Sequence, residues 1–183
     1  TLIEAIERAG HRPGEDVFIS LDIAASEFAD GDGYVMALDG ARATSAEMVE
    51  RVCAWADRYP ILSIEDPVGQ DDTPGMVAVT QRLGSKIQII GDDYLVTSAE
   101  RVAQAAQAGA CNAVLVKPNQ AGTLTEARAA LDAGRRHGFG TIVSARSGES
   151  EDVTVAHLAV GWNAGQLKVG SFARSERMAK WNE

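Results

Sequence analysis

Short apolar runs alternate with longer amphipathic segments along the whole chain. The apolar runs predict strands over Val17–Ile23, Ile61–Glu65, Ile87–Gly91, Ala113–Val116, Thr141–Ser144 and Gln166–Val169. Several are apolar at nearly every position, which is typical of strands buried on both faces of a parallel sheet. The segments between them predict helices over Ser45–Tyr59, Pro74–Leu83, Ser98–Ala108, Leu124–His137, Asp152–Gly161 and Ser175–Asn182. Repeated strand–helix alternation predicts an α/β fold built from βαβ units around a parallel sheet.

Local signals support several of these boundaries. A threonine followed three positions later by a glutamate predicts a capping box at Thr44/Glu47, Thr97/Glu100 and Thr123/Glu126. The segment Ala29–Ala43 interrupts the alternation and is rich in Gly and Asp, with a predicted hairpin over Tyr34–Leu38. We interpret it as an insertion in the first strand–helix connection and not as a domain boundary.

Composition narrows the class of protein. The 183 residues are 45% hydrophobic and carry 17 Lys+Arg against 26 Asp+Glu, a formal charge of −9. Nucleic acids and anionic membranes attract basic surfaces, so an acidic chain argues against both as partners. No apolar run approaches the roughly 20 residues of a membrane span. The two cysteines lack metal-site spacing, which favours a reduced, cytoplasmic setting.

Polar residues follow the predicted strands where each one ends. In chain order they are Asp22, Glu65, Asp92, Lys117, Arg146 with Ser147, and Lys168. Parallel strands place these ends at one edge of the sheet, where barrel enzymes carry their active sites. Converging carboxylates need a cation between them, and hard oxygen ligands prefer Mg²⁺ or a similar ion. A lysine becomes a base when a metal and a second ammonium destabilise its proton.

Each of these residues also has a purely structural interpretation. An Asp at a strand end often forms a turn or caps a helix. Arg146 and Ser147 precede a predicted helix and could hold a phosphate or carboxylate. Arg146 could instead form an exposed ion pair with Glu149 or Glu151. One such position indicates little, but six consecutive strand ends favour an active site.

The same strand ends lie in blocks that resemble the enolase family, the phosphopyruvate hydratases. The blocks are Leu21–Phe28, Ser63–Pro67, Gly91–Asp93, Lys117–Glu126, Ser147–Asp152, Gly165–Lys168 and Arg174–Arg177. They run in family order across essentially the whole chain. The resemblance implies a TIM-type (β/α) barrel like the enolase C-terminal domain, of which residues 1–183 would form an incomplete part with about six βα units.

The resemblance also implies a role for each matching residue. Magnesium ligands are expected at Asp22, Glu65 and Asp92, the proton-abstracting base at Lys117, phosphate contacts at Arg146 and Ser147, and a substrate-carboxylate contact at Lys168. The implied activity is a Mg²⁺-dependent lyase reaction of glycolysis, in which 2-phosphoglycerate loses water to give phosphoenolpyruvate. The implied partners are a small phosphorylated carboxylate and further copies of the same chain, in a cytoplasmic dimer or octamer.

Some positions depart from the family pattern. Ala145 stands where the family has an active-site histidine, Pro118 follows the expected base in place of a β-branched residue, and Gly170–Ala173 differs from the usual Gly-Ala-Pro-Ser or Gly-Ala-Pro-Ala. The departures leave open an enolase paralogue that acts on another phospho- or phosphono-carboxylate. A non-catalytic binding protein that keeps the fold is a second alternative.

The length also bears on the expected activity. Such a barrel normally takes about 250 residues, and an apolar stripe that includes Leu2 and Ile6 begins with Thr1 alone before it. We expect the N-terminal capping domain and the first barrel strands to lie outside residues 1–183. The family's Gly-Asp-Glu-Gly-Gly segment, whose glutamate is the acid, is expected there too. Residues 1–183 alone should therefore have little or no dehydratase activity.

Overall fold

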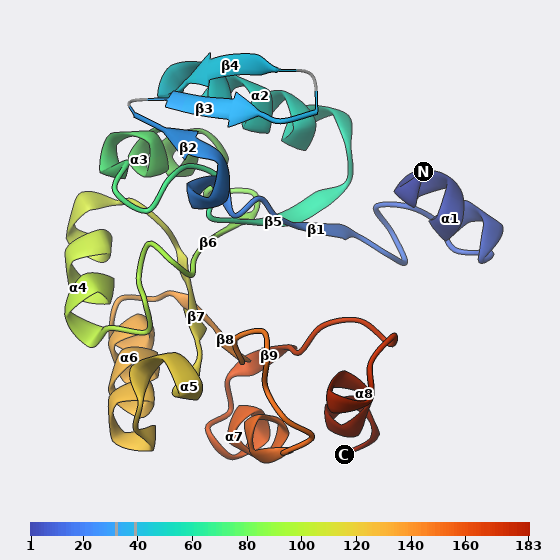
Figure 1. Cartoon of the computed structure of the whole chain (residues 1–183), viewed down its shortest axis with the longest axis vertical. Coiled ribbons are helices and arrows are strands. Elements are labelled where there is room, and N and C mark those ends of the chain that lie inside the picture. Colours follow the sequence, from blue (N-terminus) through green and yellow to red (C-terminus); the bar gives the residue numbers. More distant parts are fainter. Residues whose placement is uncertain (32, 39) are drawn as a thin grey trace. The chain divides into compact units, whose positions relative to one another are not determined.

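A computed structural model describes residues 1–31, 33–38 and 40–183 of the chain (Figure 1). The chain divides into two compact units, which are described separately. The first comprises residues 1–94 and 109–111, and the second comprises residues 95–108 and 112–183. Each unit contains a parallel sheet whose strands alternate with helices along the chain, so the expected α/β class is confirmed.

The parallel sheet of the first unit has the order β1-β5-β6. Its strands are β1 (Ile19–Asp22), β5 (Ile61–Glu65) and β6 (Gln88–Gly91), and its helices are α1 (Leu2–Arg8), α2 (Ser45–Arg58) and α3 (Thr73–Leu83). Helices α2 and α3 pack on each other, and each buries one apolar face. Met48, Ile64 and Met76 are among the largest fully buried side chains.

The insertion between β1 and α2 forms a small antiparallel sheet. After a short 3-10 helix, η1 (Ala25–Phe28), come β2 (Ala29–Asp30), β3 (Gly33–Met36) and β4 (Ala41–Thr44) in the order β2-β3-β4. The predicted hairpin over 34–38 is therefore present as the β3–β4 pair, and β2 extends it. Residues 32 and 39 of the predicted insertion lie outside the described residues.

The second unit has a parallel sheet with the order β7-β8-β9. Its strands are β7 (Ala113–Val116), β8 (Gly140–Ser144) and β9 (Gly165–Lys168). Its helices are α4 (Ala99–Ala108), α5 (Pro118–Ala121), α6 (Leu124–Arg136), α7 (Thr154–Gly161) and α8 (Ser175–Asn182). All four residues of β7 are fully buried, as its uninterrupted apolar sequence predicts. The short helix α5 has no counterpart in the sequence prediction.

Helix α6 approaches the sheet closely at Gly134. A Cβ at this position would lie 2.8 Å from Cγ1 of Val114 on β7 and 3.4 Å from Cγ2 of Thr141 on β8. The glycine therefore has a packing role that explains its place in a helix interior, where it costs about 1 kcal/mol in helix propensity.

Two of the three predicted helix starts are confirmed. Thr44 and Glu47 form a complete capping box at α2, and the Thr123 hydroxyl accepts the Glu126 backbone N–H at α6. The prediction at Thr97 is wrong, because α4 begins at Ala99 and Thr97 has a left-handed φ of 54°. Its hydroxyl bonds elsewhere, to residues that follow β7.

No helix in the described ranges is long and apolar enough to cross a membrane.

The helix and strand bounds elsewhere agree with the predicted ranges to within two residues at nearly every boundary. Helix α7 begins two residues after its predicted start because the Asp152 carboxylate accepts the Thr154 backbone N–H and lies ahead of the helix.

Candidate active site

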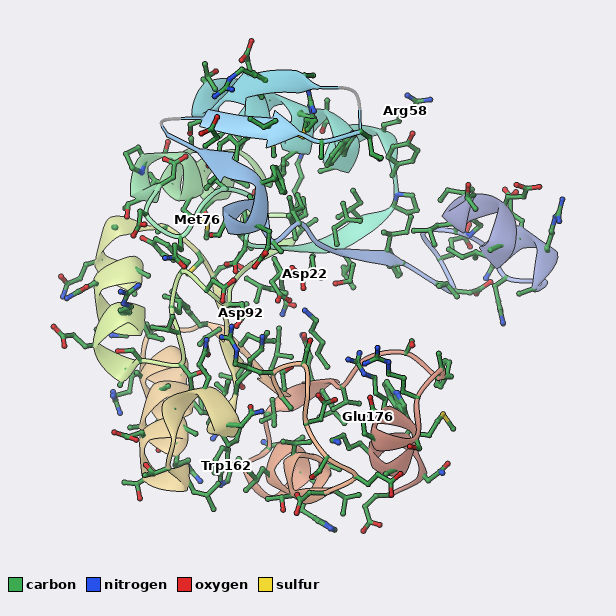
Figure 2. The ribbon with its side chains drawn as sticks, in the orientation of Figure 1. Asp22, Arg58, Met76, Asp92, Trp162 and Glu176 are labelled. Carbon is green, nitrogen blue, oxygen red and sulfur yellow. The ribbon has the colours of Figure 1, made fainter. Side chains whose placement is uncertain are left out.

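The carboxyl ends of the first unit's parallel strands carry the three predicted metal ligands. Asp22 is the last residue of β1, Glu65 is the last residue of β5, and Asp92 directly follows β6. The strand register pairs Asp22 with Glu65 and Glu65 with Ile90, two residues before Asp92. Figure 2 labels Asp22 and Asp92 at these ends. The fold therefore places all three at the same edge of this sheet.

These carboxylates differ in their exposure to solvent. Glu65 is 2% exposed and Asp92 is 7% exposed, whereas Asp22 is exposed. A buried carboxylate is costly unless hydrogen bonds or a cation compensate the lost hydration. Three carboxylates on adjacent strand ends are hard oxygen donors of the kind that Mg²⁺ prefers, so the donor chemistry of this edge fits a magnesium ion.

A fourth carboxylate, that of Asp66, lies beside Asp92. Ligand oxygens of Asp66, Asp92 and Asp93 lie within 4.8 Å of one another, and within the described part of the chain this is the group that meets that spacing. The cluster shares Asp92 with the predicted ligand set. The grouping of Asp92 with Asp22 and Glu65 around one ion stays a prediction.

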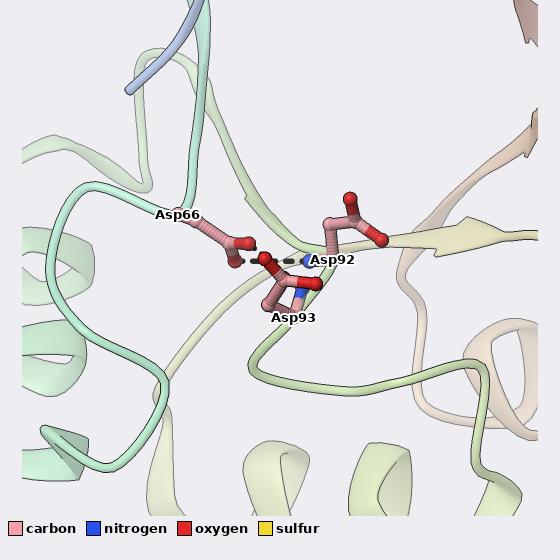
Figure 3. A group of neighbouring side chains, drawn as sticks. All are labelled: Asp66, Asp92 and Asp93. Carbon is pink, nitrogen blue, oxygen red and sulfur yellow. Dashed lines mark hydrogen bonds between the residues drawn. The ribbon is translucent and has the colours of Figure 1, made fainter. Parts of the chain in front are cut away.

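Hydrogen bonds explain the position of Asp66. Its Oδ1 accepts the backbone N–H of Asp92 at 3.0 Å, and its Oδ2 accepts that of Asp93 at 2.7 Å (Figure 3). The pKa of Asp66 is raised to about 6, mainly by burial. The two N–H groups oppose this rise, and the nearby charges of Asp92 and Asp93 contribute to it. The negative charge around Asp66 makes this edge of the sheet attractive to a cation.

The second unit carries the cationic residues, beginning with Lys117. Lys117 directly follows β7, precedes α5, and is 9% exposed. Its backbone N–H donates to Oγ1 of Thr97 at 3.0 Å, and that hydroxyl donates to Oε1 of Gln120 at 2.7 Å. Thr97 therefore fixes the turn that carries Lys117, from a residue 20 positions earlier in the chain.

The register of this sheet aligns Lys117 with Lys168. Val116 pairs with Val143, and the next pair along β8 and β9 is Ser144 with Lys168. Lys117 and Lys168 thus lie at one level of the sheet, on strands separated by β8. Adjacent strands are about 4.8 Å apart, so the two backbones are about 10 Å apart at this level.

Arg146 and Ser147 lie in the exposed loop that follows β8. The Arg146 backbone N–H donates to Oδ1 of Asn119 in α5 at 3.1 Å, which joins this loop to the turn after Lys117. Farther along the loop, Nζ of the buried Lys180 in α8 donates to the Ser150 carbonyl at 2.7 Å. The loop that carries the predicted phosphate contacts is therefore tied at both ends.

Ala145 lies between Ser144 and Arg146 and is partly exposed. Its methyl group offers no hydrogen bond to a substrate. One of the positions at which the sequence departs from the family pattern is thus adjacent to the predicted phosphate contact.

The sequence analysis did not include Asp66, Thr97 or Asn119 among the candidate site residues. The sequence did contain a signal for Asp66. Consecutive residues of a strand point to opposite faces, so Glu65 and Asp66 cannot both lie on the face of Asp22, and a separate role for one of them is expected. Thr97 matched a capping pattern that concealed its bond to Lys117. Asn119 carried no local signal.

Comparison with known proteins identifies the family. A family model described as "Enolase, C-terminal TIM barrel domain" matches residues 1–183. "Enolase 1" of Desulfitobacterium hafniense (strain Y51) is 51% identical over 184 aligned positions, and "Enolase" of Anaplasma marginale (strain St. Maries) is 50% identical over 182. Both alignments cover 100% of this chain but 42% of the relative, so the chain spans about two fifths of the length of these proteins.

The family match also confirms the expected fold class, since the parallel strand–helix alternation of both units agrees with an incomplete TIM-type barrel. Seven polar residues predicted from the sequence occupy the ends of the parallel strands or the loops that directly follow them. The match extends over all of these positions. The chain therefore belongs to the family of the enolase C-terminal TIM barrel domain.

Proposed function

We propose that this chain is part of a Mg²⁺-dependent enolase-type lyase that converts 2-phosphoglycerate to phosphoenolpyruvate. The observation that carries the proposal is the position of Asp22, Glu65 and Asp92 in one unit and of Lys117 and Lys168 in the other, each at the carboxyl end of a parallel strand. In barrel enzymes these ends carry the catalytic groups. The two relatives named enolase, at about half identity over the chain, support the same reaction.

In this proposal, Asp22, Glu65 and Asp92 hold Mg²⁺, which when bound supplies positive charge that stabilises the dianionic intermediate. Lys117, in its neutral form, takes the proton from the carbon next to the substrate carboxylate. Lys168 donates hydrogen bonds to that carboxylate. The proton moves to Nζ of Lys117, and the hydroxyl on the neighbouring carbon leaves as water after protonation by an acid.

Arg146 and Ser147 bind the substrate phosphate. A guanidinium donates two parallel hydrogen bonds to phosphate oxygens, and a serine hydroxyl adds a third. The tether from Asn119 to the Arg146 backbone supports this role, because it restricts the loop that presents the guanidinium. We therefore propose a small phosphorylated carboxylate as the substrate, because cationic side chains of this kind bind phosphate and carboxylate groups.

The remaining parts of the proposal concern the intact protein. We propose that it contains an N-terminal capping domain and further barrel strands beyond residues 1–183, including the general acid. The relatives are more than twice as long as the chain, which supports this organisation. We also propose that it works in the cytoplasm as a homo-oligomer, without nucleic acid as a partner, as its net charge of −9 favours.

A coupled assay of the intact protein tests the reaction. Phosphoenolpyruvate formation from 2-phosphoglycerate should require Mg²⁺, disappear with a chelator and return when Mg²⁺ is restored. An intact protein that binds Mg²⁺ but forms no phosphoenolpyruvate would contradict the proposed substrate. An intact protein that binds no Mg²⁺ in calorimetric titration, with Asp22→Ala making no difference, would favour a non-catalytic binding protein that keeps the fold.

Ala145 favours a second candidate, a paralogue acting on another phospho- or phosphono-carboxylate. Alanine removes a donor next to Arg146, so the phosphate end of the pocket is the part expected to accept a different group. Under this candidate, Ala145→His raises turnover of 2-phosphoglycerate and lowers turnover of the preferred alternative. If the histidine leaves both unchanged, Ala145 does not determine specificity.

A further inference from the structure

Asp66 directly follows β5 and makes hydrogen bonds to segments at the ends of the two neighbouring strands, β1 and β6. Its backbone N–H donates to the Ile90 carbonyl of β6 at 3.0 Å, and its carbonyl accepts the Ala25 N–H, just after β1, at 3.3 Å. Its carboxylate accepts the N–H groups of Asp92 and Asp93 (Figure 3). One residue therefore contacts the connections that follow β1 and β6 while it directly follows β5.

The backbone at Asp66 is held in an unusual conformation. Its φ is 40°, in the left-handed region that aspartate and asparagine tolerate better than most residues, and it is 3% exposed. In this conformation the carboxylate lies toward the turn at Asp92 (Figure 3). Both carboxylate oxygens then bond to backbone groups of that turn.

We propose that Asp66 is a positioning residue, which fixes the turn at Asp92 relative to Glu65 and Asp22 so that the three carboxylates can bind Mg²⁺ together. This inference rests on the proposed function, and specifically on the magnesium site. Residues that orient metal ligands without binding the metal commonly change its affinity about 10- to 100-fold when altered. We expect a loss in that range at Asp66.

Asp66→Asn is the appropriate variant because asparagine tolerates the left-handed conformation and keeps the side-chain volume. The amide replaces one of the two accepting oxygens with an NH₂ group, which cannot accept an N–H, so one of the two bonds to Asp92 and Asp93 is lost. Asp93→Asn is the matched control. It removes one unit of negative charge from the same carboxylate cluster and leaves both backbone N–H bonds to Asp66 in place.

The experiment is a calorimetric titration of the intact protein with Mg²⁺ alone. Asp66→Asn should weaken Mg²⁺ binding about 10- to 100-fold, and Asp93→Asn should weaken it by a smaller factor. In steady-state assays, the Mg²⁺ concentration for half-maximal rate should rise in parallel while kcat at saturating Mg²⁺ falls less. Equal losses in the two variants would mean that charge, not positioning, is responsible, and would overturn the inference.

Hydrogen exchange provides a second measurement, and its wild-type part does not depend on the folding of a variant. In the wild-type protein, the amides of Asp92 and Asp93 should exchange slowly, and Asp66→Asn should expose at least one of them. Fast exchange of both amides in the wild type would overturn the inference. If the wild-type protein does not bind Mg²⁺, the proposed function is contradicted. If it binds Mg²⁺ and Asp66→Asn binds Mg²⁺ equally well, only the role of Asp66 is contradicted.

Discussion

Individual residues in this chain are fixed by partners distant in the sequence. Thr97 is the clearest case, because its hydroxyl accepts the Lys117 N–H and it is 3% exposed. Val96 and Thr97 both have left-handed φ values, of 44° and 54°, which are costly for β-branched residues. Strained backbone is often retained where it serves a site, and here it directs a hydroxyl at the turn that carries the proposed base.

Replacing Thr97 by valine tests this contact. Valine is equally β-branched, so the backbone strain is unchanged, but the buried Lys117 N–H loses its acceptor. The free energy of unfolding should fall by about 1–3 kcal/mol, measured by chemical denaturation of the intact protein. Thr73→Val is the control, because the Thr73 hydroxyl bonds to Tyr94 at an exposed position and its loss should have little effect. Equal losses in the two variants would contradict a special role for Thr97.

The sequence predicted the position of Lys117 but not the contact of Thr97. A threonine three residues before a glutamate matches a helix cap by local criteria alone. The bond from Lys117 forms only once β7 has brought residue 117 beside residue 97, which is a tertiary effect that no local pattern contains. The same holds for Asp66, whose partners at residues 92 and 93 lie 26 and 27 positions away.

At the level of elements, the close approach of α6 to its sheet depends on a glycine. Apolar periodicity predicted the helix and its buried face, since Ala127, Ala130 and Leu131 are all fully buried. The periodicity of apolar residues does not indicate how close the helix axis lies to the strands. The contact between Gly134 and Val114 shows that the spacing is set by the absence of a side chain.

Gly134→Ala should therefore destabilise the protein despite the better helix propensity of alanine. Overpacking costs typically about 1–3 kcal/mol, against a gain in propensity of about 1 kcal/mol. Thermal unfolding should show a lower Tm for Gly134→Ala and partial recovery when Val114→Ala is added. Gly161→Ala is a matched control in α7, where a Cβ meets nothing within 4 Å, and its Tm should not fall. Comparable decreases at both glycines would contradict the packing explanation.

At the level of the whole molecule, the residues at successive strand ends indicated the family more specifically than any single motif did. Alternation along the chain predicted the parallel strands and their ends, because buried parallel strands are apolar throughout and are bounded by polar residues. The insertion's three-stranded sheet was predicted only as a hairpin, since β2 has two residues and almost no pattern of its own. Its partners are set by pairing with β3 and not by local propensity.

The acidic character of the chain also has a local cause. Of its 26 acidic residues, Asp22, Glu65, Asp66, Asp92 and Asp93 lie at the strand ends of one sheet. Carboxylates gathered at such a position repel one another, and Glu65, Asp66 and Asp92 are nearly fully buried. A bound divalent cation would relieve this repulsion, so metal binding should stabilise the fold as well as serve the reaction.

We propose that Lys117 removes a proton from the substrate in a Mg²⁺-dependent step. Exchange of the hydrogen at carbon 2 of 2-phosphoglycerate with solvent deuterium measures this step directly, before the leaving group departs. With the intact protein, exchange should require Mg²⁺ and should fall about 10²- to 10⁴-fold in Lys117→Ala, the usual contribution of a positioned base. Mg²⁺ binding by that variant should be retained. Exchange by Lys117→Ala at the wild-type rate would contradict the account.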